Sequence, residues 1–145
     1  MSETAYFLHD LIKISRHGTE FYEEAARSVP DKKLSRVFTD MAKAKTTLAD
    51  NLASELKPEH KKPAKSIDLV DEVGQTYAGM RTGLKAVNSA NITALELTES
   101  QIQVSLQKVV MDRDNSFVIR VLAKQYVHAA ENLKAELRSS KRALG

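Results

Sequence analysis

Apolar residues recur at alternating spacings of three and four along most of the chain, which is the spacing of one face of an α-helix. In the first such stretch, Leu11, Ile14 and Phe21 share a face. Pro30 ends this stretch and Pro58 ends the second, because proline interrupts the hydrogen-bond ladder of a helix. The pattern predicts five helices, over residues 4–28, 31–56, 68–87, 92–111 and 116–141.

The third predicted helix is interrupted by Gly74, Gly79 and Gly83. Each glycine lowers helix propensity by up to about 1 kcal/mol, so we expect this element to be the least regular of the five. The glycines are expected to permit close packing against another helix. Asn91 is the expected N-cap of the fourth helix, because its short polar side chain can accept from the backbone N–H groups of a first turn.

The connections between the predicted helices indicate how the helices pack. Helices one and two, and helices four and five, are joined by short loops, and short loops make antiparallel neighbours. The two hairpins are separated by residues 57–91, which contain the third helix. A helix rises about 1.5 Å per residue, so this connection is long enough to return the chain along the bundle. The sequence therefore predicts one all-α domain over residues 1–145, with two antiparallel hairpins and a long crossover that contains an additional helix.

Two charged residues stand inside otherwise apolar seams. Lys45 lies between Met41 and Leu48 in the second helix, and Glu99 follows Leu95 by one turn in the fourth. An isolated buried charge is costly, and pairing with an opposite charge is the usual remedy. We therefore expect Lys45 and Glu99 to form a buried ion pair. The alternative is that both side chains extend along their apolar stems to the solvent.

Composition narrows the class of protein. The chain has 145 residues, of which 42% are hydrophobic and 28% charged, and this balance excludes both a disordered chain and a membrane-spanning one. It contains no cysteine, which removes disulfides, thiol catalysis and thiolate metal sites. No signal peptide is evident in the first ten residues and no apolar run approaches a membrane helix, so we expect a cytoplasmic protein without membrane insertion.

The net charge of +3 does not indicate a nucleic-acid partner. The basic residues are concentrated over 57–65 and 138–142, in a linker and at a helix end, without interleaved aromatic residues. We interpret them as solvated charge. Contact with a polyanion through this linker and tail is the least favoured hypothesis.

Several short segments resemble a known family. Residues 18–26, Gly-Thr-Glu-Phe-Tyr-Glu-Glu-Ala-Ala, followed by Leu-Ser-Arg-Val-Phe at 34–38 and Met-Ala at 41–42, resemble the opening hairpin of ferritin and rubrerythrin relatives. More closely, the chain is similar to a bacterial family of uncharacterised ferritin-like proteins, a domain family of unknown function. The resemblance implies a ferritin-like four-helix bundle. It is a packing pattern more than a catalytic signature, so it supports the fold strongly and an activity weakly.

The metalloproteins of that superfamily hold two metal ions with a Glu from each of two helices and a Glu-x-x-His pair from each of the other two. Carried over by position, the resemblance places these ligands at residues that mostly cannot bind iron. Only Glu99 is clearly kept, so we predict a degenerate di-iron site without cofactor, and at its former position a buried polar cluster in which Ser15 and Gln125 hydrogen-bond to the ion pair. The corresponding positions are Ser15, Lys45, Leu48, Glu99, Gln125 and His128.

No nucleophile–base pair and no phosphate-binding motif is present, so no catalytic residue is assigned. The sequence favours a non-catalytic binding or oligomerisation module, acting as a homo-oligomer or on a protein partner. The alternative is a ferritin-like metalloprotein, an iron binder or oxidase, that holds iron or manganese in a rearranged site around Glu99, Gln125 and His128.

Overall fold

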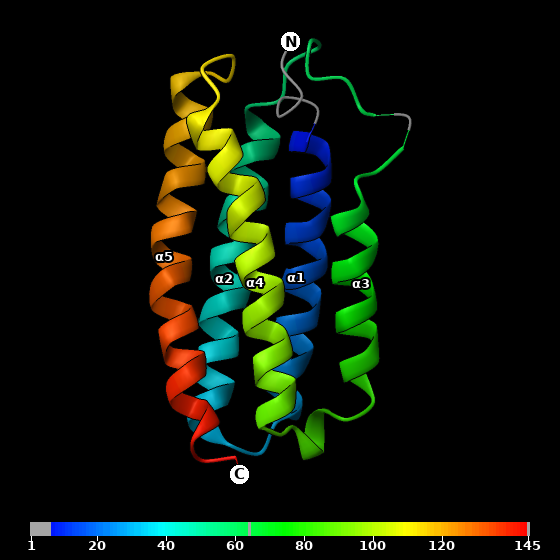
Figure 1. Ribbon diagram of the computed structural model, residues 1–145, viewed down its shortest axis with the longest axis vertical. Helices are drawn as coiled ribbons and strands as arrows, with labels where there is room; N and C mark the ends of the chain where they lie inside the picture. Colours follow the sequence, from blue (N-terminus) through cyan, green and yellow to red (C-terminus); the bar gives the residue numbers. More distant parts are fainter. Residues whose placement is uncertain (1–6, 64, 145) are drawn as a thin grey trace.

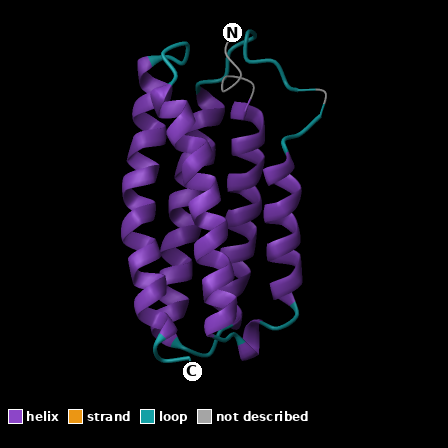
Figure 2. Cartoon of the chain, in the orientation of Figure 1, coloured by secondary structure: helices purple, strands orange, loops and turns teal. Residues whose placement is uncertain are grey.

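The computed structural model describes residues 7–63 and 65–144. Within these residues the chain forms five α-helices and no strand (Figures 1 and 2). The predicted start of the first helix at residue 4 lies outside the described residues. The helices are α1 (Leu8–Ser28), α2 (Lys32–Ser54), α3 (Asp68–Arg81), α4 (Ser89–Met111) and α5 (Phe117–Lys141), with a short 3-10 helix η2 (Leu84–Ala86) between α3 and α4.

The five helices lie side by side along the long axis of the molecule. α1 pairs with α2 and α4 with α5, each pair joined by a short connection at one end, and α2 packs against α5 (Figure 1). α3 packs against both α1 and α4, on the side of the molecule opposite α5. Because α3 and its flanking loops return the chain to the end at which α2 begins, α2 and α4 run in the same direction.

Short polar side chains begin three of the helices. Asp31 accepts a hydrogen bond from the backbone N–H of Leu34 at 2.9 Å, and Ser116 caps α5 in the same way. At the start of α4, Asn88 accepts from the N–H of Asn91 at 3.0 Å while the Asn91 side chain accepts from the N–H of Asn88 at 2.9 Å. The expectation that Asn91 is the N-cap is therefore wrong. It is the third residue of the helix and forms a reciprocal capping box with Asn88, and the helix begins three residues earlier than predicted.

The third predicted helix is shorter than expected. α3 ends at Arg81, and a turn that contains Gly83 leads into η2, so the predicted single helix over residues 68–87 is divided into two. The expectation that this element is the least regular is confirmed. The expected packing role of the glycines is wrong for Gly74 and Gly79, because a Cβ added at either would meet no atom within 4 Å.

The apolar stripes of the helices meet in one core. Its centre is aromatic: the ring of Phe21 stacks on that of Tyr77 with 4.5 Å between centroids and meets the ring of Tyr22 edge-on at 5.0 Å. Tyr22 in turn lies 5.5 Å from the ring of Phe38. These rings pack α2 and α3 against α1 and define the surroundings of the polar residues at mid-bundle.

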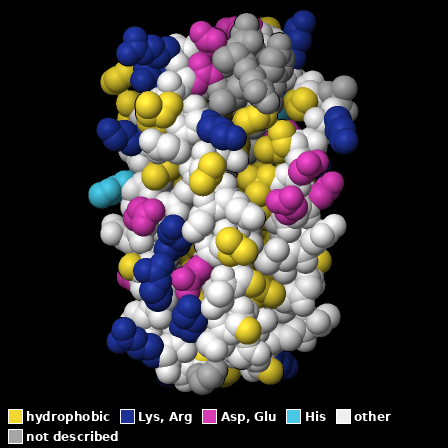
Figure 3. Space-filling view, in the orientation of Figure 1, with side chains coloured by type: hydrophobic (Ala, Val, Ile, Leu, Met, Phe, Trp, Pro, Cys, Tyr) yellow, Lys and Arg dark blue, Asp and Glu magenta, His cyan; other side chains and the backbone are white. Residues whose placement is uncertain are grey.

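The surface also carries apolar residues. Figure 3 shows them between charged side chains on the face over α4. In the described part of the chain, no helix combines the length and the apolar character needed to cross a membrane. The large apolar side chains that are exposed are Leu97, Val104, Met111, Phe117 and Val118.

Candidate functional site

Each of the five helices contributes one side chain to a buried polar group at mid-bundle. Tyr22 comes from α1, Lys45 from α2, Tyr77 from α3, Glu99 from α4 and Tyr126 from α5. We call these five residues the polar cluster. The side chains of Lys45 and Glu99 are 1% and 2% exposed, so both charges are withdrawn from water.

The helical pattern explains why these side chains point inward. Lys45 stands one turn from Met41 and from Leu48, which are both buried in the core. Glu99 stands in the same relation to Leu95 and Ile102 on α4. Both residues lie on the inward-facing apolar stripe of their helices. Their side chains therefore point into the interior of the bundle and not to the surface.

The ammonium and the carboxylate are in direct contact. Lys45 Nζ lies 2.7 Å from Glu99 Oε1, which agrees with the ion pair expected from the sequence and not with two side chains extended to solvent. Nζ also donates to the hydroxyl of Tyr126 at 2.8 Å, and that hydroxyl donates to Oε1 at 3.3 Å. The other carboxylate oxygen, Oε2, accepts from Tyr22 at 3.2 Å and from Tyr77 at 3.3 Å. A carboxylate has about four acceptor positions, and here all four are occupied.

A glycine of α1 makes room for the lysine. A Cβ added to Gly18 would overlap Cδ of Lys45, lie 2.9 Å from its Cε and lie 3.4 Å from the hydroxyl of Tyr77. The long stem of Lys45 therefore passes over the backbone of α1 at the one residue of that helix without a side chain. The role of Gly18 is therefore to leave space for the Lys45 side chain, which could not take this path past a larger residue.

Burial and charge set the protonation of the polar cluster. Burial, the largest single effect, lowers the pKa of Lys45, but the charge of Glu99 and the interactions with Tyr126 and Tyr77 together outweigh it, and the net pKa is well above its ordinary value. Burial, followed by the Glu99 charge, raises the pKa of both Tyr22 and Tyr77 well above the ordinary value. Burial also raises the pKa of Tyr126 to about 12, although the Lys45 ammonium opposes the rise. At neutral pH the cluster thus holds a charged ammonium and three neutral hydroxyls, which matches the pattern of donors and acceptors.

Two of the residues predicted to join the ion pair do not contact it. Ser15 is buried, but its hydroxyl donates to the carbonyl of Leu11 at 2.7 Å within α1. Gln125 is exposed, so its predicted place in the buried cluster is wrong. The cause is helical geometry, since Gln125 precedes Tyr126 by one residue and is rotated about 100° from the inner face.

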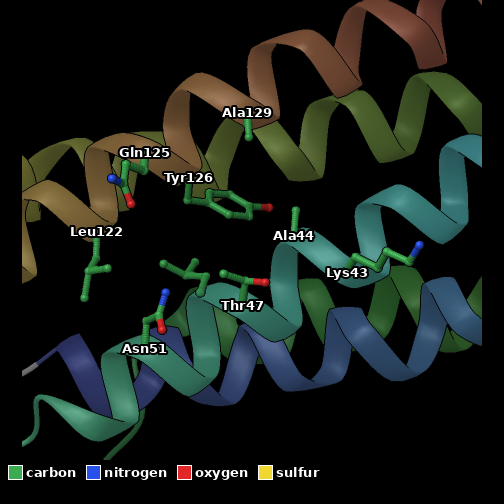
Figure 4. A pocket seen from close by; sticks show the side chains of 9 residues that line it. Lys43, Ala44, Thr47, Asn51, Leu122, Gln125, Tyr126 and Ala129 are labelled. Atoms are coloured by element: carbon green, nitrogen blue, oxygen red, sulfur yellow. The ribbon is translucent and has the colours of Figure 1, made fainter.

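Gln125 lines a groove between α2 and α5 (Figure 4). It has a volume of about 300 Å³, and Gln125, Ala44 and Ala129 are among its lining residues. Figure 4 shows the ring of Tyr126 extending from α5 toward α2. Because the Tyr126 hydroxyl contacts both Lys45 and Glu99, its ring lies between the groove and the ion pair.

The three residues of the rearranged metal site that the sequence left as an alternative differ in their exposure. Glu99 is buried, whereas Gln125 and His128 are exposed on α5, and neither contributes to the hydrogen bonds of the carboxylate. Over residues 7–63 and 65–144, no three or more His, Cys, Asp or Glu side chains are grouped so that they could hold a metal ion.

The residues at mid-bundle do not fit the two-metal centre that the ferritin resemblance implies. Such a centre needs several carboxylates and imidazoles that converge on one point. The polar cluster offers one carboxylate, Glu99, whose four acceptor positions are used, and it places the ammonium of Lys45 2.7 Å from one of the oxygens. A protonated amine repels a metal cation, so the donor set and the local charge both oppose binding.

The three tyrosines were not predicted as part of the site. The signal was present, because Tyr77 and Tyr126 stand on the apolar stripes of their helices and Tyr22 lies beside the stripe of α1. A buried tyrosine hydroxyl needs a hydrogen-bond partner. Three such hydroxyls on inner faces therefore indicate a shared acceptor, which in this chain is Glu99.

Comparison with protein families gives one match. The model of the family described as "Domain of unknown function (DUF2383)" matches residues 3–112, which include α1 to α4 and most of the polar cluster but not Tyr126. No curated protein and no solved structure matches the chain.

Proposed function

The chain belongs to the DUF2383 family of domains of unknown function, and we propose that this member is a ferritin-like helical bundle that lacks a dimetal centre and acts as a non-catalytic binding and oligomerisation module. The observation that carries the proposal is the contact of 2.7 Å between Lys45 and Glu99 at mid-bundle.

The order and direction of the helices support the ferritin-like assignment. Two antiparallel hairpins are joined by a crossover that contains α3, and α2 and α4 run in the same direction (Figure 1). One long crossover between two hairpins is the connection of ferritin-like folds. Under this assignment, the polar cluster takes the place where metalloproteins of that fold gather their ligands.

The chemistry of the polar cluster supports a structural role. Lys45 neutralises Glu99, and the hydroxyls of Tyr22, Tyr77 and Tyr126 satisfy the remaining acceptor positions. Because its four acceptor positions are occupied, the Glu99 carboxylate has none left for a substrate or a reacting group. The polar cluster therefore joins the five helices, and interaction with partners is left to the outer surface.

Metal analysis tests the proposal directly. The 145-residue protein is produced in medium supplemented with iron and manganese, purified without chelators and analysed by elemental mass spectrometry. We expect well under one tenth of a metal ion per chain. Near-stoichiometric iron or manganese in the wild-type protein would refute the proposal, and loss of that metal in a folded Glu99→Gln variant would place it at the polar cluster.

A further inference from the structure

Three large apolar side chains on the outer face of α4 are exposed among polar ones such as Gln101 and Lys108, and none of the described segments covers them. Leu97, Val104 and Met111 are 62%, 59% and 70% exposed and are spaced seven residues apart. The inner face of the same helix is buried, with Leu95 and Ile102 at 0% and 1% exposure. Exposed apolar side chains aligned on a second face of a helix are typical of an interaction surface.

The spacing of the three residues indicates what covers them. Residues seven apart on a helix form a straight seam of the kind by which two helices pair along their length. From Leu97 to Met111 the seam is about 21 Å long at 1.5 Å per residue. That length suits an interface of standard size, about 800 Å² on each partner, of which the seam forms the apolar centre. We call Leu97, Val104 and Met111 the α4 seam.

Charges of opposite sign flank the α4 seam. On the side of α3, Glu72 lines the same surface hollow as Leu97, and Asp68 and Asp71 are exposed nearby on the same helix. The side of α5 carries three basic residues beside two acidic ones, Glu96 and Glu131. There Lys134 Nζ lies 3.2 Å from Ser100 Oγ, Arg138 Nε 3.3 Å from Glu96 Oε2 and Lys141 Nζ 3.1 Å from Glu96 Oε1.

We propose that the α4 seam binds a second copy of this chain, about a twofold axis parallel to α4. This inference rests on the proposed oligomerisation function and names its surface. Such an axis sets α4 parallel to its copy, so that Leu97, Val104 and Met111 each meet the same residue of the partner. It also places the acidic α3 side of each copy over the basic residues of the α5 side of the other.

The charge pattern selects this partner and this orientation. The order acidic, apolar, basic across one face is complementary to itself when the face is turned about an axis along α4, which is the condition for an interface between identical copies. A twofold axis perpendicular to α4 would instead place α3 of one copy over α3 of the other and oppose like charges.

Light scattering coupled to size-exclusion chromatography tests the dimer. The 145-residue chain has a mass of 16.1 kDa, and we expect twice this mass at tens of micromolar. Val104→Glu places two carboxylates against each other at the seam and should raise the dimer Kd at least 100-fold. The matched control, Thr39→Glu, adds the same charge at an exposed position on α2 and should leave the Kd unchanged.

Cysteine cross-linking tests the orientation, because the chain has no cysteine of its own. Leu97→Cys and Met111→Cys should each form a disulfide-linked dimer alone under mild oxidation, and Thr39→Cys should not. An axis perpendicular to α4 predicts the reverse, with linkage only when the first two variants are mixed.

A wild-type chain that stays monomeric, or a dimer that Val104→Glu does not weaken, would overturn the inference. Either result leaves the metal analysis untouched, and stoichiometric metal would leave the dimer untouched. The two failures are therefore distinguishable.

Discussion

At the scale of single residues, Lys45 and Glu99 depend on each other because both are buried. Glu99→Gln keeps the shape of the side chain and an acceptor oxygen but removes the charge that compensates the ammonium. Breaking one side of a buried pair costs about 3–5 kcal/mol. We expect the free energy of unfolding to fall by this amount, as measured by urea denaturation at neutral pH.

Adding Lys45→Met to Glu99→Gln removes the uncompensated charge. The double variant should therefore be more stable than Glu99→Gln alone, although the three tyrosines lose part of their acceptor. A double variant no more stable than the single one, or a single variant that loses less than about 1 kcal/mol, would mean that the pair is as weak as one at the surface.

The pKa shifts of the polar cluster predict how stability depends on pH. Tyrosine ionises near pH 10 in an unfolded chain, but the pKa of Tyr126 is about 12 in the folded protein and the pKa values of Tyr22, Tyr77 and Lys45 are also raised. The unfolded state therefore releases these protons first. The contribution of Tyr126 is fully present below pH 10 and is lost as pH rises through 12, on the order of 2–3 kcal/mol. The contributions of the other three groups change in the same direction.

Tyrosinate absorbance and circular dichroism, followed together between pH 8 and pH 13, check this prediction. We expect three tyrosines to ionise only as the helices unfold. In Tyr126→Phe, two tyrosines should do so. Ionisation of all tyrosines near pH 10 with the helices intact would show that the hydroxyls are accessible and would contradict the buried contacts of the polar cluster.

The two charges of the site could be predicted from the sequence, and its hydrogen bonds could not. A Lys or Glu in an apolar seam is visible as an exception to the pattern, so Lys45 and Glu99 were found. Gln125 was misplaced because a ligand position was carried over from a resemblance, and a rotation of one residue moved it outside. The tyrosines count as apolar residues in the helical pattern, so the pattern does not reveal that their hydroxyls are polar and need hydrogen-bond partners.

At the scale of the helices, glycines with opposite surroundings give a matched pair of substitutions. Alanine stabilises a helix by roughly 0.5–1 kcal/mol relative to glycine when its Cβ has room. Gly79 on α3 has no atom within 4 Å of such a Cβ, so Gly79→Ala should stabilise the protein. Gly18→Ala should destabilise it by about 1–3 kcal/mol, because the Cβ overlaps the stem of Lys45. Denaturation titrations of both variants check the signs.

An increase in stability for Gly18→Ala would show that Lys45 can move aside without loss. The helix boundary was predictable at Pro30, because proline interrupts a helix. The start of α4 was misplaced at Asn91, because Asn88 and Asn91 are both residues that can cap a helix and the sequence does not rank them. The end of α3 was not predictable, because the apolar stripe continues through Leu84 into η2. An apolar stripe indicates which side of a helix is buried, but it does not distinguish an α-helix from a 3-10 helix.

At the scale of the whole molecule, the short loops predicted the two hairpins, and the long connection predicted the crossover. The α4 seam was not predicted, although its residues are as regularly spaced as those of the inner face. Periodicity shows which residues share a face of a helix. It does not show which face is covered by other segments of the same chain. The expected cytoplasmic location stays a prediction.

The contribution of one cluster residue from every helix has a consequence for synthesis on the ribosome. Lys45 emerges 54 residues before Glu99 and 81 before Tyr126. Until the later segments arrive, the first hairpin has no counter-charge with which to bury its lysine, and we expect that hairpin to stay open to water. Such distant pairing slows folding, and it leaves the apolar surface of the first hairpin exposed until the later helices have been made.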